Sequence, residues 1–406
     1  LGFTCLSISV VPKVEIGLDQ ELSMPEDSFV LKFFEWMKLY LSVGPPVYLV
    51  VNNTAGALDL STVRDQNLLC SGVEGCREDS VAGQVDQWRQ YPDQSYIATT
   101  AFSWVDDYIS WVNTETKGVV HCCRFYEDTT QFCDHPGTLI DEPVCKKCFN
   151  GTIRPEDSTL FQQTIHHFLQ QNPGEHCPKA GHGAFADAVN HEIIEVNSPL
   201  GENSHLYDVK SSNMMAFHTI LRTSVDYYSA LAKARELTDS ITASININRT
   251  AEEQVTVFPY SVFYVFYEQY LTMWEDTLTS LGISLGAIFV VTFLLMGLDL
   301  TSAIIVLFTV LLILVNLGAF MYWWNITLNA VSLTNLVMAV GISVEFSAHI
   351  MRYFAKFARE DRVENARKAV INMGSSVLSG ITLTKFGGII VLGFAHSRIF
   401  TIFFFR

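Results

Sequence analysis

Long uncharged, apolar stretches distinguish the second part of the chain from the first. Between residues 300 and 344 there is no Asp, Glu, Lys, Arg or His, and one bilayer-spanning helix needs about 20 consecutive apolar residues. The pattern therefore predicts four membrane spans, at residues 277–298, 300–324, 329–350 and 372–397. Residues 1–11 are also apolar but too few to span, and we interpret them as the end of a truncated transmembrane helix that Pro12 terminates.

The part of the chain before these spans has the shorter periods of a globular domain. Apolar residues recur at helical spacing over residues 29–40, behind Asp27 or Ser28 as the N-cap. A short apolar strand is predicted at residues 47–51, and a strand at residues 14–18 would complete a β-α-β unit with it.

Further patterns extend this mixed α/β assignment. Helices are predicted at residues 80–90, 103–112, 156–171 and 223–245. Strands are predicted at residues 213–221 and 255–258. We therefore expect residues 12–276 to form an α/β ferredoxin-like domain, with a disulfide-stapled insertion between Cys70 and Cys177.

The two parts of the chain differ in the sign of their charge. Residues 1–276 carry 17 Lys and Arg against 37 Asp and Glu, a net charge of −20. Residues 277–406 carry 9 against 5, a net charge of +4. The acidic surface argues against a nucleic-acid partner, and the composition predicts a soluble acidic domain joined to a basic membrane block.

Cysteines and glycosylation signals predict an oxidising compartment for the acidic domain. Eight of the nine cysteines lie between Cys70 and Cys177, and disulfides persist in exoplasmic compartments. Three Asn-x-Ser/Thr sequons, at Asn52, Asn150 and Asn248, agree with that location. Together these residues predict a disulfide-rich, glycosylated domain on the lumenal side of the membrane.

A zinc site is the alternative interpretation of the same cysteines. The residues with suitable spacing are Cys122, Cys123, Cys133, Cys145, Cys148, His121 and His135. Exoplasmic redox conditions favour disulfides, so we expect no metal here. Cys70 and Cys76 are close enough in sequence for a local bridge, and the other six cysteines allow fifteen pairings.

The segment that links the third and fourth predicted spans, residues 351–371, is basic. Its cationic residues are Arg352, Lys356, Arg359, Arg362, Arg367 and Lys368. By the positive-inside tendency we expect a cytoplasmic amphipathic loop, which places the acidic domain on the lumenal side. Residues 398–406 would then begin the next lumenal connection.

Glu345 and Lys385 are charges inside predicted spans. An ionisable side chain at such a depth costs about 3 kcal/mol on insertion scales and usually serves a function. His349 follows Glu345 by one helical turn and lies on the same helix face. We interpret the three as candidates for an ion relay in which a proton taken up by Glu345 breaks a pair with Lys385. The alternatives are a structural ion pair and a carboxylate that snorkels to the headgroups.

Catalytic signatures are weak in this sequence. His191-Glu192-Ile193-Ile194-Glu195 begins like a zinc-protease motif but lacks the second His. There is no phosphate-binding glycine loop and no nucleotide fingerprint. We therefore expect neither an enzyme nor a cofactor.

Several stretches along the whole chain resemble RND-type permeases of the Patched superfamily, and more closely the Niemann–Pick type C family of intracellular cholesterol transporters. They are GLDQELSMPEDS (17–28), GPPVYLV (44–50), WVDDY (104–108), FPYSVFYVFYEQYLT (258–272), NAVSLTNLVMAVGISVEF (329–346) and MGSSVLSGITLTKFGGI (373–389). On this resemblance the chain corresponds to the C-terminal half of such a transporter, with half of an RND-type helix bundle.

The resemblance implies a multi-pass protein of the lysosomal and late endosomal membrane that moves cholesterol or a related sterol out of the lumen. Its implied partners are the sterol, a soluble lumenal sterol carrier and membrane lipid. It implies that Glu345 matches the acidic position of the RND ion relay. The cysteine pairs that it implies are Cys70–Cys76, Cys122–Cys177, Cys123–Cys148 and Cys133–Cys145.

Related functions remain as alternatives to lysosomal export. They are a sterol-responsive receptor of the Patched class, an ion-driven RND-type exporter, and a member of the sterol-uptake branch of the same family. The segments TLTKFGGI and YSVFYVFY favour the lysosomal branch over the uptake branch.

Overall fold

The computed structural model describes most of the chain, and its described part divides into two compact units. Residues that it does not describe are 1, 26, 114–121, 127–131, 134–144, 150–157, 196–204, 248, 251–253, 357–360, 381–385, 395–398 and 406. The sheet unit comprises residues 41–221 and 229–265. The helical unit comprises residues 1–40, 222–228 and 266–406.

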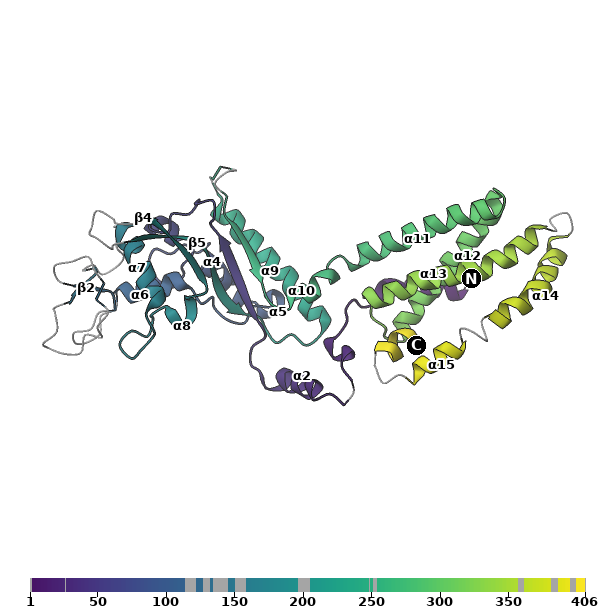
Figure 1. Cartoon of the computed structure of the whole chain (residues 1–406), viewed down its shortest axis with the longest axis horizontal. Helices are drawn as coiled ribbons and strands as arrows, with labels where there is room; N and C mark the ends of the chain where they lie inside the picture. The colour runs from purple at the N-terminus through teal and green to yellow at the C-terminus, as the bar shows by residue number, and fades with distance from the viewer. Residues whose placement is uncertain are drawn as a thin grey trace. The chain divides into compact units, whose positions relative to one another are not determined.

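A four-stranded antiparallel sheet forms the centre of the sheet unit (Figure 1). Its spatial order is β4-β5-β1-β6, from strands β1 (Pro46–Asn52), β4 (Val189–Glu195), β5 (Leu206–Phe217) and β6 (Thr256–Tyr260). Helices connect β1 to β4 and β5 to β6. The resulting β-α-β-β-α-β order is that of a ferredoxin-like domain, as the sequence predicts.

Side chains of β1 alternate between a buried and a half-buried environment, which fixes the face that the sheet turns toward the core. Val47, Leu49 and Val51 are each about 1% exposed, as the two-residue period of a strand requires. Gly44 precedes this strand, and a Cβ atom there would lie 2.0 Å from the carbonyl oxygen of Thr219. The close approach of the two backbones therefore requires glycine at this position.

Helices of the sheet unit carry its aromatic core. Their bounds are α3 (Val63–Gln66), α4 (Val81–Arg89), α5 (Pro92–Ser95), α6 (Trp104–Asn113), α7 (Ser158–Gln170), α8 (His182–Phe185) and α9 (Ser224–Ile245), the last contributing to both units. The four helices predicted in this region are confirmed as α4, α6, α7 and α9. Tyr108 on α6 packs edge-on against Phe161 and Phe168 on α7, with ring centroids 5.1 and 5.6 Å apart.

Two strand predictions differ from the structure. Residues 14–18 form no strand: Val11–Lys13 is a short 3-10 helix, η1, and Ile16 makes a single isolated bridge with Leu328. Val14 is instead buried in the helical unit with Met321 and Leu328. The apolar pattern of residues 14–18 therefore arises because Val14 packs in the core of the helical unit, and not because these residues pair with a strand. Strand β5 begins at Leu206 and ends at Phe217, earlier than the predicted residues 213–221.

Four disulfides lie in the sheet unit, in the connection between β1 and β4. They join Cys70–Cys76, Cys122–Cys177, Cys123–Cys148 and Cys133–Cys145, and are the pairs that the family resemblance implies. The same connection holds a small two-stranded sheet of β2 (Arg124–Tyr126) and β3 (Cys145–Lys147). Cys123 directly precedes β2 and Cys148 directly follows β3, so their disulfide closes one end of this sheet. The remaining cysteine, Cys5, is exposed and unpaired among the cysteines.

The predicted glycosylation sites are only partly within the described residues. Asn52 is half-buried at the end of β1, and its Oδ1 atom accepts hydrogen bonds from the backbone N–H of Thr54 at 3.1 Å and from the Thr54 hydroxyl at 2.9 Å. Asn150 and Asn248 lie outside the described residues. Glycosylation at all three therefore stays a prediction.

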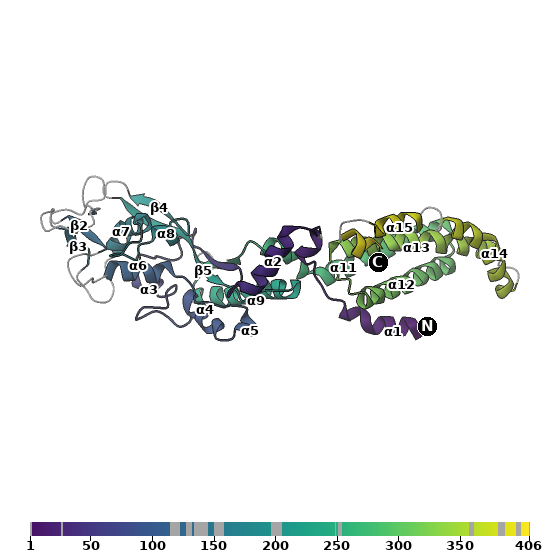
Figure 2. The same ribbon diagram turned by 90° about the horizontal axis from the view of Figure 1, so that it is seen from below.

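Long helices make up most of the helical unit (Figures 1 and 2). Their bounds are α1 (Gly2–Val10), α2 (Phe29–Tyr40), α11 (Met273–Leu295), α12 (Leu300–Trp323), α13 (Ala330–Lys356), α14 (Arg362–Gly380) and α15 (Gly387–Gly393). Shorter elements are η2 (Gln20–Ser23), α10 (Tyr264–Tyr267), η4 (Glu268–Tyr270) and the π-helix η6 (Phe400–Phe405). The Ser28 hydroxyl accepts from the N–H of Val30 at 3.3 Å, which is the cap predicted for α2.

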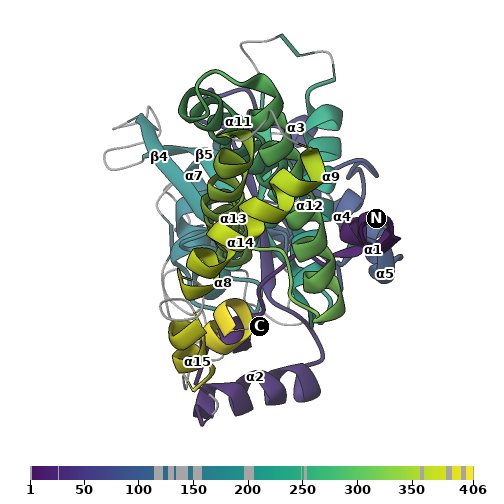
Figure 3. The same ribbon diagram turned by 90° about the vertical axis from the view of Figure 1, so that its right-hand side faces the viewer.

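Three helices in the described part, α11, α12 and α13, are long and apolar enough to cross a membrane. They correspond to the first three predicted spans, and Figure 3 views them near end-on, grouped together. Helix α13 extends to Lys356, and α14 occupies much of the predicted basic loop. Because residues 381–385 lie outside the described part, the fourth span stays a prediction.

Candidate functional site

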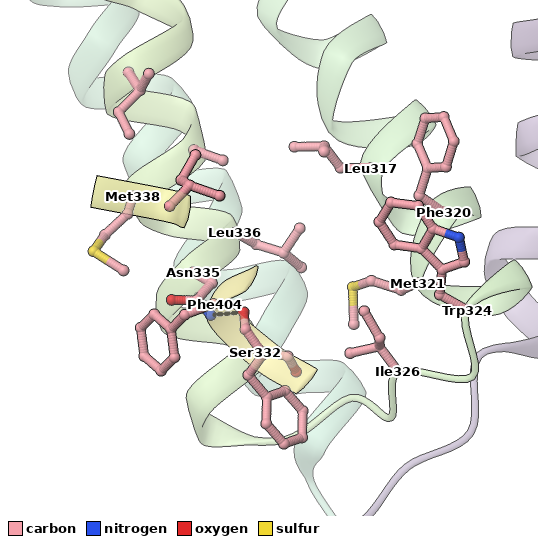
Figure 4. Close-up of a pocket in the computed structure, with 14 residues that line it drawn as sticks. Leu317, Phe320, Met321, Trp324, Ile326, Ser332, Asn335, Leu336, Met338 and Phe404 are labelled. Carbon is pink, nitrogen blue, oxygen red and sulfur yellow. Dashed lines mark hydrogen bonds between the residues drawn. The ribbon is translucent and has the colours of Figure 1, made fainter. Parts of the chain in front are cut away.

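A cavity of about 610 Å³ lies between α12, α13 and the C-terminal segment of the helical unit. Figure 4 shows side chains of α12 on one side of it and side chains of α13 on the other. The residues that line it are Leu317, Phe320, Met321, Trp324, Ile326, Ser332, Asn335, Leu336, Met338, Ala339, Ile342, Ile389, Phe403 and Phe404. Its volume falls in the range of about 300–1,000 Å³ that is typical of small-molecule sites.

The lining is apolar apart from the Trp324 indole and the side chains of Ser332 and Asn335, counting the described residues alone. The Ser332 hydroxyl already has partners next to it in the chain: it accepts from the N–H of Asn329 at 2.9 Å and donates to the Asn329 carbonyl at 3.1 Å. These two hydrogen bonds pair the backbone groups of Asn329, the residue directly before α13. The polar groups that remain for a ligand are therefore the indole N–H of Trp324, which is on an exposed side chain, and the side-chain amide of Asn335.

The side-chain amide of Asn335 makes a hydrogen bond through its nitrogen atom and not through its oxygen atom, within the described residues. Its Nδ2 atom donates to the carbonyl oxygen of Phe403 at 2.7 Å, the dashed line in Figure 4. Its Oδ1 atom is buried and has no hydrogen-bond partner within the described residues. A buried acceptor left in this state costs about 1–3 kcal/mol. The cavity thus combines apolar walls with one unsatisfied acceptor.

A second, smaller cavity of about 370 Å³ lies between η1, α11 and α12. Its polar lining groups are the Trp274 indole and the hydroxyl of Thr277, which donates to the carbonyl oxygen of Met273 at 2.7 Å. Met321 and Leu336 line both cavities. The two apolar spaces are therefore neighbours that share two side chains.

Comparisons with known proteins identify relatives that match along the entire chain. The chain is 44% identical over 410 residues to "NPC intracellular cholesterol transporter 1" of Sus scrofa, which covers 100% of the chain and 30% of that protein. It is 45% identical over 405 residues to the homolog 1b of Drosophila melanogaster, covering 99% of the chain and 30% of the relative. No protein-family model matches.

A more divergent relative gives the same result. "NPC1-like intracellular cholesterol transporter 1" of Homo sapiens is 38% identical over 414 residues, covering 97% of the chain and 30% of the relative. The chain is therefore similar over its whole length to one part of the NPC intracellular cholesterol transporters. It spans less than a third of the length of these relatives.

Two of the three predicted ion-relay residues, Glu345 and His349, lie on α13 beyond the cavity. Glu345 and His349 are one turn apart, both are exposed, and Glu345 follows the cavity residue Ile342 by three positions. Glu345 makes at least one interaction in the structure. Lys385 lies outside the described residues, so its pairing with Glu345 stays a prediction.

Two other clusters that suggest chemistry have structural explanations. Cys70, Cys76 and Asp106 lie within metal-site distances, but the two sulfur atoms form a disulfide and Asp106 accepts from the N–H of Gly72 at 2.9 Å. Residues 282–286 read Gly-Ile-Ser-Leu-Gly, a pattern that also occurs at the nucleophile elbow of hydrolases. Ser284 is inside the continuous helix α11, and its hydroxyl donates to the Ser280 carbonyl at 2.8 Å, so no elbow is formed.

Asn335 carries no charge, so it does not stand out within its predicted span as Glu345 does. An uncharged side-chain amide inside a predicted span was the available signal, since such a group must find a partner in the bilayer. No sequence pattern predicts that the carbonyl oxygen of Phe403, 68 residues further along the chain, accepts a hydrogen bond from Asn335.

Proposed function

We propose that this chain is the part of a sterol transporter that holds the sterol within the bilayer, in the cavity between α12 and α13. The named function of its relatives, intracellular cholesterol transport, supports this class of ligand. The observation that carries the proposal is the pairing of apolar walls with the unsatisfied Oδ1 atom of Asn335. A sterol has a rigid apolar body and one hydroxyl donor, and it would complete this site without leaving another polar group unpaired.

We also propose that the sheet unit lies on the lumenal side of the membrane and that proton uptake drives sterol transport. Four disulfides in the sheet unit support a lumenal position for it. A lysosomal or late endosomal membrane, delivery by a soluble lumenal carrier, and coupling through Glu345, His349 and Lys385 follow from the family resemblance. In this scheme sterol passes from the lumenal side into the apolar cavity, and protonation of Glu345 changes the packing of α13.

Filling the cavity is expected to abolish sterol binding. Ala339→Trp places a large ring in the space between α12 and α13, and we expect sterol affinity to fall at least about ten-fold, because a bulky ring cannot share the volume with a ligand. The measurement is equilibrium binding of radiolabelled cholesterol to the chain in lipid nanodiscs. Thr334→Trp, on an exposed position of the same helix, is the matched control and should bind as the parent does.

Binding by Ala339→Trp at the parent level would contradict the proposed site. Loss of binding in both tryptophan variants would instead indicate that bulk anywhere on α13 disturbs the helix. In that case the smaller substitution in the next test decides the question. Sterol binding with no movement of sterol between vesicles by the full-length protein would favour the receptor alternative.

Asn335→Leu is expected to abolish the preference of the site for a sterol with a 3-hydroxyl group over one with a 3-keto group. The parent chain should prefer cholesterol over its 3-keto analogue about five- to ten-fold, the equivalent of one hydrogen bond of about 1 kcal/mol, because the ketone cannot donate to Oδ1. The variant should bind both compounds alike. Thr334→Val serves as the control, and an unchanged preference in Asn335→Leu would show that the hydroxyl is recognised elsewhere.

A further inference from the structure

A short segment near the start of the helical unit, residues 15–19, lies against the start of α13. The N–H of Leu328 donates to the carbonyl oxygen of Glu15 at 2.7 Å, and the N–H of Gly17 donates to the carbonyl oxygen of Leu328 at 3.0 Å. The Nδ2 atom of Asn329 donates to the carbonyl oxygen of Gly17 at 3.2 Å. The last of these bonds joins residues 312 positions apart in sequence.

Asn329 is also the N-cap of α13, the helix that forms one wall of the proposed sterol cavity. Its Oδ1 atom accepts hydrogen bonds from the N–H of Val331 at 2.9 Å and from the N–H of Ser332 at 3.1 Å. Ser332 lines the cavity, and the cavity residue Asn335 follows about one helical turn later. One side-chain amide therefore binds Gly17 through its nitrogen and the first turn of α13 through its oxygen, so Gly17 helps to position the start of the cavity wall.

The same segment holds the first turn of α9. The Oδ1 atom of Asp19 accepts from the hydroxyl of Ser224, the first residue of α9, at 2.6 Å and from its N–H at 3.3 Å. Gly17 and Ser224 are both buried, and a Cβ atom on Gly17 would lie 2.4 Å from the Cβ atom of Ser224. Gly17 is therefore in close contact with α9, while its carbonyl oxygen binds the cap of α13.

Helix α9 extends this contact into the sheet unit, because its 22 residues contribute to both units. Its first turn belongs to the helical unit, where Tyr227 also stacks on Tyr267 with a centroid distance of 4.6 Å. Further along α9, Leu231 and Leu237 are buried in the sheet unit. A continuous helix and a chain of hydrogen bonds are the kinds of element that carry coupling between distant sites.

We propose that Asp19 is a positioning residue for the sterol cavity. It closes the α9–α13 junction, which consists of residues 15–19, Ser224 and Asn329, so that the starts of α9 and α13 move together. Sterol binding between α12 and α13 is thereby coupled to the position of α9, and by linkage the coupling is reciprocal. This inference rests on the sterol cavity proposed above.

Hydrogen exchange of the chain in phosphatidylcholine nanodiscs without sterol tests the junction itself. Asp19→Ala should speed exchange of the first-turn amides of α13, residues 330–333, about five-fold, which is the typical effect of losing a helix cap. The reason is that the segment that binds Asn329 loses its hydrogen bonds to α9. Asp19→Asn keeps an oxygen that accepts from Ser224, so it should exchange as the parent does.

Asp226→Ala is the matched control for Asp19→Ala. The Oδ2 atom of Asp226 accepts from the N–H of Arg222 at 3.0 Å and from the N–H of Thr223 at 2.9 Å, so it caps the same turn from within α9. Its removal weakens the start of α9 and leaves the hydrogen bonds of Asp19 in place. Exchange of residues 330–333 should therefore be unchanged in this variant.

Cholesterol provides the second readout, which a merely structural role of Asp19 would not move. Adding cholesterol to the parent should slow exchange in the first two turns of α9 at least about three-fold. Asp19→Ala should lose that response and bind cholesterol about five-fold more weakly, because the cap of α13 is less firmly held. Asp226→Ala and Asp19→Asn should retain both the response and the affinity.

Unchanged exchange of residues 330–333 in Asp19→Ala, or an equal change in Asp226→Ala, would overturn the proposal. A cholesterol response of α9 that survives in Asp19→Ala would overturn it as well. Absence of cholesterol binding by the parent would overturn the sterol site and the coupling to it. The exchange measured without sterol distinguishes that failure from failure of the α9–α13 junction.

Discussion

Replacing Cys122 and Cys177 by serine is expected to lower the free energy of unfolding of the sheet unit by about 4 kcal/mol. The disulfide joins residues 55 apart in sequence, and in the chain-entropy description a crosslink that closes a longer loop restricts the unfolded chain more strongly. Both cysteines are buried. Denaturant unfolding of the chain in detergent, followed by tryptophan fluorescence, measures the change.

The bridge between Cys70 and Cys76 is the matched control for this loop-length effect. It spans only 6 residues, so its replacement by serine should cost about 2 kcal/mol. Both variants remove one disulfide from the same connection of the fold, and of the four cysteines only Cys76 is half-buried instead of buried. Equal losses in the two variants would contradict the entropic explanation and would assign the effect to packing around the sulfur atoms.

Acidification is expected to destabilise the sheet unit through His218. This side chain is fully buried; its Nδ1 atom donates to the carbonyl oxygen of Tyr96 at 2.9 Å, and its Nε2 atom accepts from the hydroxyl of Tyr264 at 2.9 Å. Burial raises the pKa of Tyr264, which keeps that hydroxyl protonated as the donor. Burial also lowers the pKa of His218 from 6.5 to about 4.

The direction of the pH effect follows from this lowered pKa. The unfolded chain binds a proton at His218 below about pH 6.5, whereas the folded chain does so only near pH 4. The contribution of neutral His218 is therefore complete above pH 6.5 and is lost as the pH falls toward 4. Between pH 7.5 and pH 5 the loss amounts to about 2 kcal/mol.

Hydrogen exchange of the β1 amides at pH 7.5 and pH 5, corrected for intrinsic rates, measures this loss. His218→Gln should be less stable than the parent at pH 7.5, because one of the two buried hydrogen bonds is lost. Its stability should change about 2 kcal/mol less between the two pH values. A pH dependence identical to that of the parent would show that another group is responsible.

Elements with a strong local pattern could be predicted from the sequence. The helix at Phe29–Tyr40 follows a capping serine, and α4 begins behind Ser80, whose hydroxyl accepts from the N–H of Gly83. Long apolar stretches with few or no charges similarly located α11, α12 and α13. In these segments local capping, periodicity and composition agree with the tertiary environment, which is why the prediction succeeds.

Long-range contacts could not be predicted in the same way. Residues 14–18 have a strand-like apolar pattern, yet Val14 is buried beside Met321, more than 300 residues away in sequence. The contact between Asn335 and Phe403 and the meeting of His166 with His191 depend on how helices pack, which the spacing of residue types does not encode. The candidate site was therefore found only once these packings were known.

The two side chains common to both apolar cavities, Met321 and Leu336, lie where the two spaces adjoin. Methionine is unbranched and changes rotamer at little cost, and such changes need no movement of the helices themselves. The separation of the two spaces therefore depends on the torsions of these two side chains as well as on the distance between the helices.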